Sequence, residues 1–457
     1  MATDFAQKDT PAPFTVAMGG SGSSGVYEHI LNREIVATEQ RGVAWTSMPL
    51  DEAVLINPPT KLLRGESYPF VDMAAISAGR RNVEANEERI FTGGGSRFQD
   101  GDTLMARITP CLENGKIARF KAVSDACVGH GSTEFIVLRG KPGVSDSAFV
   151  YYLTIEPAFH AFAVSQMTGT SGRQRVPTNA LGSYKVHLPP LAEQKRLASI
   201  LGALDDKIEL NRCMNAKLED MARTLFKSWF VDFDPVRAKL DGRPPAGMDA
   251  ATAALFPDAF EESALGLIPK GWEVRSLDKT ADYLNGLALQ KNPPNDGPTL
   301  PVVKIAQLRK GNTVGADRCN TELPPNYIVQ DGDVLFSWSG SLEVELWCGG
   351  SGALNQHLFK VTSAEFPKWF YYLWTLHHLD EFRLIAADKA TTMGHIQRGH
   401  LTGAKVLIPS RNLLGAMSRI VSPLIEQLIA NRIQSRNIAA QRDTYLPMLM
   451  NVHLITN

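Results

Sequence analysis

The chain lacks the features that mark secreted proteins, membrane-spanning proteins and proteins stabilised by a bound metal. No apolar run approaches the roughly 18–20 residues that cross a bilayer, and the N-terminus lacks the charged-then-apolar layout of a signal peptide. The five cysteines are scattered without a C-x-x-C spacing. This argues against a zinc site and against a disulfide framework, and it fits a reducing compartment. We therefore expect a cytoplasmic protein without a membrane segment or a metal site.

The chain also lacks an excess of charge of either sign. Its 47 Lys and Arg residues and 48 Asp and Glu residues give a formal net charge of −1. Any nucleic-acid binding must therefore come from local basic patches and not from a globally basic body. With 457 residues, 44% of them hydrophobic and 21% charged, the composition is that of a soluble globular protein of two to four domains.

The tetrapeptide QDGD occurs twice, at Gln99–Asp102 and Gln330–Asp333. In both copies an apolar run follows Asp-Gly, which predicts a tight turn leading into a strand. Five further pairs of similar segments occur in the same order, with offsets between 220 and 232 residues. They are WTSMPLDEA with WEVRSLDKT, YPFVDMAAIS with LPVVKIAQLR, STEFIVLRG with NQHLFKVTS, FVYYL with WFYYL, and RVPTNALGSYKVHLPP with HIQRGHLTGAKVLIPS. This common order indicates an internal duplication.

Each half begins with a strand-rich domain, over 43–190 and 267–410. Short β-branched and aromatic runs are separated by Gly, Pro and Asn-Pro breaks, and we expect a helix at each YYL segment. A long helix follows each domain, over 191–230 and from 411 into the C-terminus at 457. The predicted fold class is α+β, with two tandem strand-rich domains that are each followed by a long helix.

Both long helices carry a coiled-coil seam. Apolar positions separated alternately by four and three residues give a period of 3.5, which is typical of paired helices. The same positions shifted by 220 residues keep this seam in the second helix, with Arg442 as the exception. The seam positions are Leu197, Leu201, Leu204, Ile208, Asn211, Asn215, Leu218, Ala222, Leu225 and Trp229, and then Met417, Val421, Leu424, Leu428, Asn431, Ser435, Ile438, Arg442, Tyr445 and Leu449.

The order of domains and helices predicts an antiparallel pair. The first helix, about 60 Å long at 1.5 Å per residue, leads away from the first domain, so the second must lead back, which gives pseudo-twofold symmetry. Equivalent residues then meet only where the symmetry axis crosses. A polar Asn occupies the seam near both helix centres, and we expect Asn211 and Asn431 to face each other there and fix the register. The alternative is that either side chain is merely solvated at a frayed seam.

Two segments lie outside this repeat. The stretch 231–266 carries Pro- and Gly-rich breaks and an Asp-Pro pair, which predicts a connector with short helical turns. The stretch 1–42 contains GGSGSSG at Gly19–Gly25 and is expected to be a flexible tail. We assign this tail no function.

Several motifs resemble one known family. They are LPPLAEQKRLASIL at the start of the first long helix, LFKSWFVDFDPVRAK at its end, TAALFPDAFEESALGLIPKGWEV before the second domain, and NGKIA followed by GSTEFIVLR in the first domain. From about residue 43 onward the chain resembles the specificity subunit of type I restriction–modification enzymes. It departs from the family in its long N-terminal tail and in PSRNLLG at Pro409–Gly415, where the first copy has PPLAEQ.

The resemblance implies that this chain recognises DNA and that partner subunits carry out catalysis. Each strand-rich domain would be a target-recognition domain reading one half of a bipartite site in double-stranded DNA. The helices would set the gap between the half-sites and dock two adenine-N6 methyltransferase subunits. A restriction and translocation subunit would complete the complex. S-adenosylmethionine, ATP and Mg²⁺ would then bind to the partner subunits, and this chain would need no cofactor. Because the two domains differ strongly in their loops, we expect an asymmetric site.

The motifs that could indicate an enzyme are incomplete. Asn57–Thr60 and Asn292–Asn295 begin with Asn-Pro-Pro, but Thr60 and Asn295 stand where an N6-adenine methyltransferase has an aromatic residue that stacks on the flipped base. The glycine-rich TGGGSRF from Thr92 lacks the Gly-Lys-Ser/Thr ending of a phosphate-binding loop. We interpret both Asn-Pro-Pro segments as turns and expect a non-catalytic chain.

Candidate DNA-binding residues are those with reachable donors on polar loops, because base and phosphate contacts favour Arg, Lys, Asn, Gln and hydroxyl groups. Solvated loops carry the same residues, so the alternative of a plain surface role stays open. In the first domain the candidates are Arg80, Arg81, Asn114, Lys116, Arg119, Arg173, Gln174 and Arg175. In the second they are Arg309, Lys310, Ser337, Trp338, Lys389, Thr391, Thr392, His395, Gln397 and Arg398.

Two other functions remain open from the residues alone. The first is a self-contained methyltransferase fused to a recognition domain, which saturable binding of S-adenosylmethionine to the purified chain would favour. The second is a coiled-coil scaffold whose β domains bind protein or carbohydrate. A salt-dependent, sequence-selective shift of duplex DNA in the presence of a methyltransferase partner would exclude it.

Overall fold

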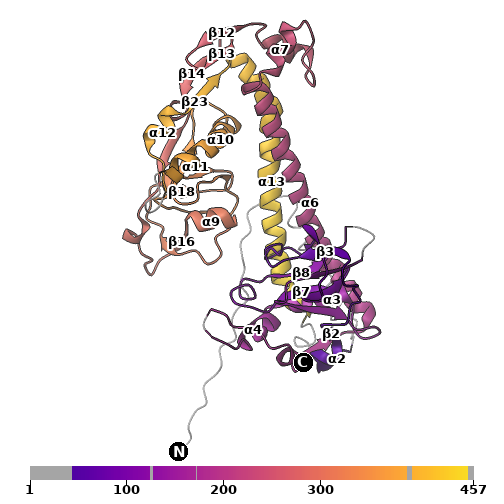
Figure 1. Cartoon of the computed structure of the whole chain (residues 1–457). Coiled ribbons are helices and arrows are strands. Elements are labelled where there is room, and N and C mark those ends of the chain that lie inside the picture. Colours follow the sequence, from indigo (N-terminus) through magenta and orange to yellow (C-terminus); the bar gives the residue numbers. More distant parts are fainter. Residues whose placement is uncertain (1–43, 124–126, 171, 389–393, 451–457) are drawn as a thin grey trace, which may run out of the picture. The chain divides into compact units, whose positions relative to one another are not determined.

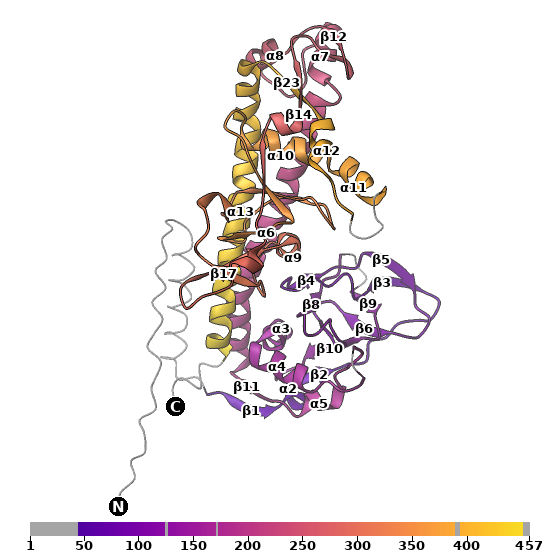
Figure 2. The same cartoon turned by 90° about the vertical axis from the view of Figure 1, so that its left-hand side faces the viewer.

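The computed structural model describes residues 44–123, 127–170, 172–388 and 394–450. The predicted tail, 1–42, lies outside these residues. The chain forms two compact units, one running up to Gly202 and resuming at Ala440, the other spanning Ala203–Ala439. The boundary falls inside both long helices, so that each unit holds one strand-rich domain and part of each helix (Figures 1 and 2).

The first domain contains two main sheets with the strand orders β2-β10-β7-β8-β4 and β5-β3-β9-β6, and a separate antiparallel pair, β1-β11. The rings of Phe98 and Phe120 pack in a tilted arrangement at 4.7 Å between centroids, within a cluster of buried residues that both sheets supply. The strands are β1 Thr46–Pro49, β2 Val54–Ile56, β3 Ser67–Val71, β4 Asn82–Val83, β5 Glu87–Ile90, β6 Ser96–Gln99, β7 Thr103–Ala106, β8 Ile117–Phe120, β9 Val128–Gly131, β10 Phe135–Gly140 and β11 Lys185–Leu188. The helices are α2 Leu50–Ala53, α3 Ser147–Ile155, α4 Pro157–Ser165 and α5 Thr178–Gly182.

The second domain repeats this plan with two four-stranded sheets, ordered β15-β22-β19-β20 and β17-β16-β21-β18, and the pair β14-β23. Its strands are β14 Glu273–Ser276, β15 Asp282–Asn285, β16 Thr299–Val303, β17 Arg318–Asn320, β18 Ile328–Val329, β19 Val334–Ser337, β20 Val344–Leu346, β21 Gly352–Leu354, β22 Leu358–Thr362 and β23 Lys405–Ile408. Its helices are η1 Leu277–Lys279, η2 Leu289–Lys291, α9 Ile305–Lys310, η3 Pro325–Tyr327, α10 Lys368–His377, α11 Leu379–Asp388 and α12 Arg398–Gly403.

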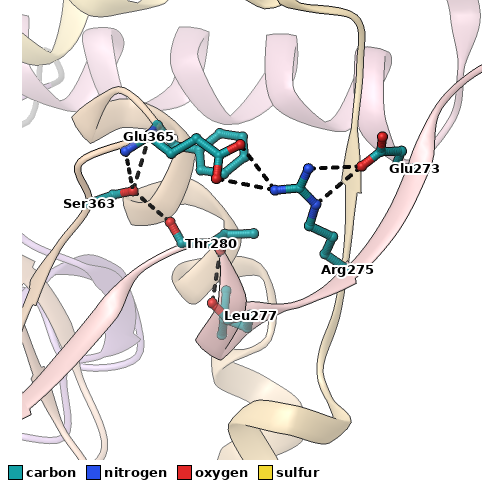
Figure 3. A network of polar contacts seen from close by, with 7 residues as sticks. Glu273, Arg275, Leu277, Thr280, Ser363 and Glu365 are labelled. Carbon is teal, nitrogen blue, oxygen red and sulfur yellow. Dashed lines mark hydrogen bonds and ion pairs between the residues drawn. The ribbon is translucent and has the colours of Figure 1, made fainter.

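A polar network ties β14 to the turn that follows β22 (Figure 3). Arg275 on β14 bonds both Glu273 and Glu365 with N–O distances of 2.9 and 3.0 Å. On the other side of the turn, Ser363 Oγ donates to the carbonyl of Thr280 at 2.7 Å. These contacts fix the edge pair against the main sheet of the domain.

The repeated QDGD segments form the same turn in both domains. The backbone N–H of Gln99 donates to Asp102 Oδ2, and that of Gln330 donates to Asp333 Oδ2, each at 2.8 Å. The glycines, Gly101 and Gly332, have φ values of 82° and 85°. This left-handed conformation favours glycine over residues with a Cβ. The turn requires a glycine at the position with positive φ and an aspartate that accepts the N–H of the first residue. This requirement explains why the same tetrapeptide occurs in both domains.

Both YYL segments lie on buried helices, as the sequence predicts. Every residue from Phe149 to Thr154 on α3 is buried, and so is every residue from Trp369 to Thr375 on α10. The hydroxyl groups of Tyr283 and Thr375 lie 2.6 Å apart, which satisfies two buried polar atoms that α10 and β15 bring together. A helix packed on one face of the main sheet is thus common to both domains.

The long helices are α6, Leu191–Phe230, and α13, Arg411–Met450. None of the twenty seam positions is exposed. Within Ala203–Ala439 the pairing is antiparallel, because Asn211 lies opposite Gln434 whereas Glu219 lies opposite Arg432. The seam exception, Arg442, is 6% exposed and lies 2.7 Å from Asp443 Oδ1. The fold class predicted from the sequence is confirmed.

The connector is more structured than the sequence predicts. It contains α7 Asp234–Leu240, α8 Ala250–Leu255 and a hairpin of β12 Phe260–Ser263 with β13 Gly266–Pro269. Phe256 and Ile268 are buried in the core cluster of the second unit. The short helices were expected and the hairpin was not. The turn composition that marks a connector does not distinguish an irregular loop from a two-stranded hairpin.

Among the described residues α13 is long and apolar enough to cross a membrane by length and composition. This stretch is not an uninterrupted apolar run, because Arg419 and Glu426 lie within it. In the structure Met417, Val421 and Leu428 of this helix belong to the buried core of the second unit. A soluble core helix accounts for this composition.

Candidate nucleic-acid interface

Three predicted DNA-binding residues of the first domain are engaged in internal contacts. Arg81 Nη1 donates to the carbonyl of Gly202 at 2.9 Å, and Lys116 Nζ donates to that of Met73 at 2.6 Å. Arg119 Nε donates to the carbonyl of Gly101 at 3.4 Å, and burial, followed by the neighbouring Arg81, lowers the pKa of Arg119. Arg81 thus holds the domain to the start of α6, whereas Lys116 and Arg119 make contacts within the domain.

The loop 168–179 presents one internally paired arginine and two more accessible residues. Arg175 makes a bidentate ion pair with Glu134, with Nη2 to Oε1 at 2.7 Å and Nε to Oε2 at 2.9 Å. The hydrogen bond from Arg175 lowers the pKa of the Glu134 carboxyl group, so the pair is charged at neutral pH. Arg173 is exposed and Gln174 half-buried. Asn114 is exposed and Arg80 half-buried on other loops.

In the second domain the structure removes Ser337 from the candidates. Its side chain is fully buried, and its hydroxyl donates to the carbonyl of Ser341 at 2.6 Å, so it presents no polar group at the surface. The neighbouring Trp338 is half-buried. Its Nε1–H donates to Asn285 Oδ1 at 2.9 Å and to the Gln356 carbonyl at 3.2 Å.

The remaining candidates of the second domain lie at helix ends and loops. Arg309 pairs with Glu343 at 3.1 Å, and Lys310 beside it is exposed. Arg398 Nη2 donates to the carbonyl of Tyr283 at 3.1 Å, whereas Gln397 caps α12. His395 lies edge-on to Trp338, at 6.4 Å between ring centroids. Lys389, Thr391 and Thr392 lie outside the described residues.

A cavity of about 400 Å³ opens on the first domain, and its arginines were not predicted as candidates from the sequence. It brings together two motifs that were set aside as incomplete, the Asn-Pro-Pro segment and the glycine-rich loop. Asn57 has a φ of 48°, and its Oδ1 accepts the N–H of Val137 at 2.9 Å, so the chain bends at Asn57 and continues without regular structure over 58–60. The lining includes Asn57, Thr60, Ser96, Arg97, Arg107 and Phe135.

The two seam asparagines lie against each other's helix. Asn211 Nδ2 donates to Gln434 Oε1 at 2.9 Å, to Ser435 Oγ at 3.2 Å and to the backbone carbonyl of Asn431 at 3.4 Å. Asn431 Nδ2 donates to Asn215 Oδ1 at 2.9 Å. Both side chains are buried, and each donates its amide N–H across the seam. The side-chain partners, Gln434 and Ser435 for Asn211 and Asn215 for Asn431, lie one helical turn from the equivalent asparagine of the other helix.

Among the described residues no group of three or more His, Cys, Asp or Glu side chains could hold a metal ion. The five cysteines are free, and Cys319 and Cys348 are buried. Burial raises the pKa of the Cys348 thiol to about 11. Neither observation identifies a reactive centre.

Comparison with known proteins points to one family. The chain matches the type I restriction modification DNA specificity domain twice, over residues 59–220 and 269–436. It is 25% identical over 313 residues to the MjaIX specificity subunit of Methanocaldococcus jannaschii, covering 66% of this chain and 68% of the relative. It is 23% identical over 404 residues to the HindI specificity subunit of Haemophilus influenzae, covering 78% and 86%.

Solved structures of the same kind also align. The type I restriction–modification S subunit from M. genitalium aligns with a TM-score of 0.49 at 14% identity, covering 90% of this chain and 96% of the other. The HsdS subunit from Thermoanaerobacter tengcongensis aligns with a TM-score of 0.34 at 18% identity, covering 89% and 96%.

Proposed function

The chain belongs to the family of type I restriction–modification DNA specificity subunits, and we propose that it reads an asymmetric, two-part site in double-stranded DNA. It is the non-catalytic subunit of such a system. The observation that carries the proposal is the pair of matching domains, 59–220 and 269–436, each with a long helix after it. A single chain that recognises two half-sites requires two recognition domains and a spacer between them.

The asymmetry of the site follows from the residues available for reading. Apart from the exposed cations, the first domain offers Gln174 and Asn114 on accessible loops, whereas the second offers Gln397. Different donors and acceptors select different base pairs, because each base pair presents its own pattern in the major groove. Two copies within one chain have diverged independently, so the half-sites need not be palindromic.

Type I specificity subunits assemble with methyltransferase and restriction subunits. For this chain we propose two methyltransferase subunits, with S-adenosylmethionine bound by them, and one translocating restriction subunit that uses ATP and Mg²⁺. An apolar stripe on the outer face of α6 supports docking on the helix pair. It consists of Leu210, Met214 and Met221, which are 53%, 37% and 51% exposed. Steps of four and seven residues place them on one face of the helix, away from the seam.

The helix pair would serve as the spacer. Its register decides how far apart the domains are held, and the buried seam amides are suited to fix it. A cytoplasmic location follows from this function, since the substrate is the cell's own and incoming DNA.

One experiment tests the proposal directly. The chain is co-expressed with its cognate methyltransferase subunit, and methylated adenines are mapped across the host genome. A bipartite motif with two different halves and a gap of constant length is the expected result. Methylation without such a motif, or a motif unchanged when this chain is omitted, would refute it.

A further inference from the structure

A shared backbone arrangement surrounds the residue that follows β7 in the first domain. Arg107 donates its backbone N–H to the carbonyl of Glu134 at 2.9 Å and accepts from the N–H of Val176 at 2.8 Å. Glu134 precedes β10, and Val176 ends the loop that carries Arg173, Gln174 and Arg175. Arg107 is therefore held between the main sheet and the predicted reading loop.

The second domain has the same arrangement around the residue that follows β19. Trp338 donates its backbone N–H to the carbonyl of His357 at 3.3 Å and accepts from the N–H of Ile396 at 3.0 Å. His357 precedes β22, just as Glu134 precedes β10. An antiparallel bridge joins Ser339 to His395 here and Ile108 to Arg175 in the first domain. The two backbones are equivalent at all three points.

The side chains on this common backbone are chemically different. The first domain has Arg107, with the ion pair of Glu134 and Arg175 beside it. The second has Trp338 in place of Arg107, with His357 and His395 in place of the ion pair. Its indole is tilted against the His357 ring at 5.9 Å and edge-on to the His395 ring at 6.4 Å. Elsewhere the domains keep the type of residue, as in Val176 and Ile396, both buried and aliphatic. Conserved geometry with divergent chemistry is what two domains that read different sequences require.

Arg107 is placed to act on a ligand. It lines the cavity of about 400 Å³ that opens on the domain. Its Nε is buried, and no described residue accepts a hydrogen bond from it. The opposite holds for Trp338, whose single N–H is already donated to Asn285 and Gln356. An arginine with donors to spare suits a ligand with two acceptors, and a satisfied indole offers mainly an apolar surface.

We propose that Arg107 and Trp338 occupy the equivalent specificity-determining position of the two domains. The inference rests on the proposed function and adds to it the class of base pair that each domain takes there. Arg107 selects a guanine, whose O6 and N7 accept two hydrogen bonds from one guanidinium. Trp338 disfavours a G·C pair at the equivalent position. It favours thymine, whose C5-methyl group makes apolar contacts. Glu134 with Arg175, and His357 with His395, are positioning residues for these two side chains.

The test uses the complex with its methyltransferase and reads the methylated motif at sequence resolution. In Arg107→Gln, preference at one G·C pair in one half-site falls by roughly 5- to 150-fold, the range measured for a single base contact. The other half-site, read by the unchanged second domain, is the internal control in the same data. The reciprocal Trp338→Arg is expected to change one position of that other half-site towards guanine.

Further variants separate this role from the alternatives. Arg107→Lys keeps the charge but loses bidentate geometry, and we expect the same position to broaden. If Arg107→Gln lowers methylation of all sites equally and leaves the motif intact, Arg107 contacts a phosphate and the inference is wrong. If Arg107→Gln fails to fold, judged by its thermal unfolding, Arg107→Lys decides the question. A wild-type complex without any bipartite motif would instead refute the proposed function, and the inference with it.

Discussion

Asn431 Nδ2 on α13 donates to Asn215 Oδ1 on α6 at 2.9 Å, across a seam in which both side chains are less than a tenth exposed. The two bonded residues are 216 positions apart in the sequence. The seam positions on either side of Asn215 are Asn211 and Leu218. A shift towards Leu218 would leave the Asn431 amide buried without a partner, so the seam amides disfavour that register relative to the observed one.

Replacing Asn431 by Ala is expected to destabilise the helix pair by about 1–3 kcal/mol, since it leaves the Asn215 side chain buried without its partner. The double variant Asn215→Ala/Asn431→Ala is expected to lose less than the sum of the two single variants. Thermal unfolding followed by circular dichroism at 222 nm measures all three changes. Lys217→Ala, at an exposed position of α6, is the control. Additive losses would show that the two amides do not interact.

A pH-dependent contact joins the second domain to its own helix. Arg432 of α13 pairs with Glu219 at 2.8 Å and with Glu345 at 3.0 Å, where the three side chains are 28%, 28% and 38% exposed. Burial raises the pKa of Glu345, and the charge of Arg432 opposes that rise. A carboxyl group whose pKa is raised in the folded state contributes stability below its unfolded pKa and loses it as the pH rises through the folded pKa.

Arg432→Met removes the charge that opposes the rise, so the folded pKa of Glu345 should rise further. We therefore expect the stability deficit of the variant to be smallest near the unfolded pKa of a glutamate, about 4.3, and to grow towards neutral pH. At pH 7 the deficit should lie between about 1 kcal/mol, the upper value for exposed pairs, and about 3–5 kcal/mol for a buried one. Unfolding midpoints between pH 4.5 and 8 measure it, with Arg419→Met on the exposed face of α13 as control. A deficit independent of pH would contradict this account.

The elements that are predicted best from the sequence are those whose packing requires apolar residues at a regular spacing. The 3.5-residue seam spans both long helices because every turn meets the partner, and Leu197 and Met417, near the starts of α6 and α13, are fully buried. The hairpin β12-β13 shows no such regular spacing of apolar residues in the sequence. Its strands have four residues each and carry exposed Leu267 beside buried Ile268. A run of that length does not distinguish a strand from a loop.

The site was predicted less well, because the availability of a side chain depends on distant residues. Arg175 meets Glu134 41 residues away, and Arg81 meets the carbonyl of Gly202 121 residues away. Neither partner can be identified from local sequence. Arg107 was missed although the repeat contained a signal. It stands after QDGDTLMA where Trp338 stands after QDGDVLFS, and a difference in chemistry at one point of a duplicated framework identifies the position.

The outer stripe of α6 gives a prediction about assembly. Leu210→Asp with Met214→Asp should weaken binding of the methyltransferase subunit by roughly 100-fold or more, because each buried apolar side chain contributes about 1.5–3 kcal/mol. Co-purification and analytical ultracentrifugation of the mixed subunits measure the change. Leu384→Asp on α11, at a residue that is 69% exposed, is a matched control and should bind normally. If both variants bind alike while the helix content is unchanged, the docking surface lies elsewhere.

The accessible basic residues give a prediction about salt. Arg173 and Lys310 are exposed cations on loops or helix ends of the two domains, and phosphate contacts by such residues release counterions. For the assembled complex on its target duplex, Arg173→Gln should reduce the slope of log K against log salt concentration by about 0.9, and Arg173→Gln/Lys310→Gln by about twice that. Affinity should fall equally for target and non-target duplexes, since phosphates carry no sequence information. Arg243→Gln, in the connector and paired with Asp241, should leave the slope unchanged. An unchanged slope in the double variant together with a broadened motif would mean instead that these residues contact bases, because base contacts specify the sequence and neutralise no phosphate.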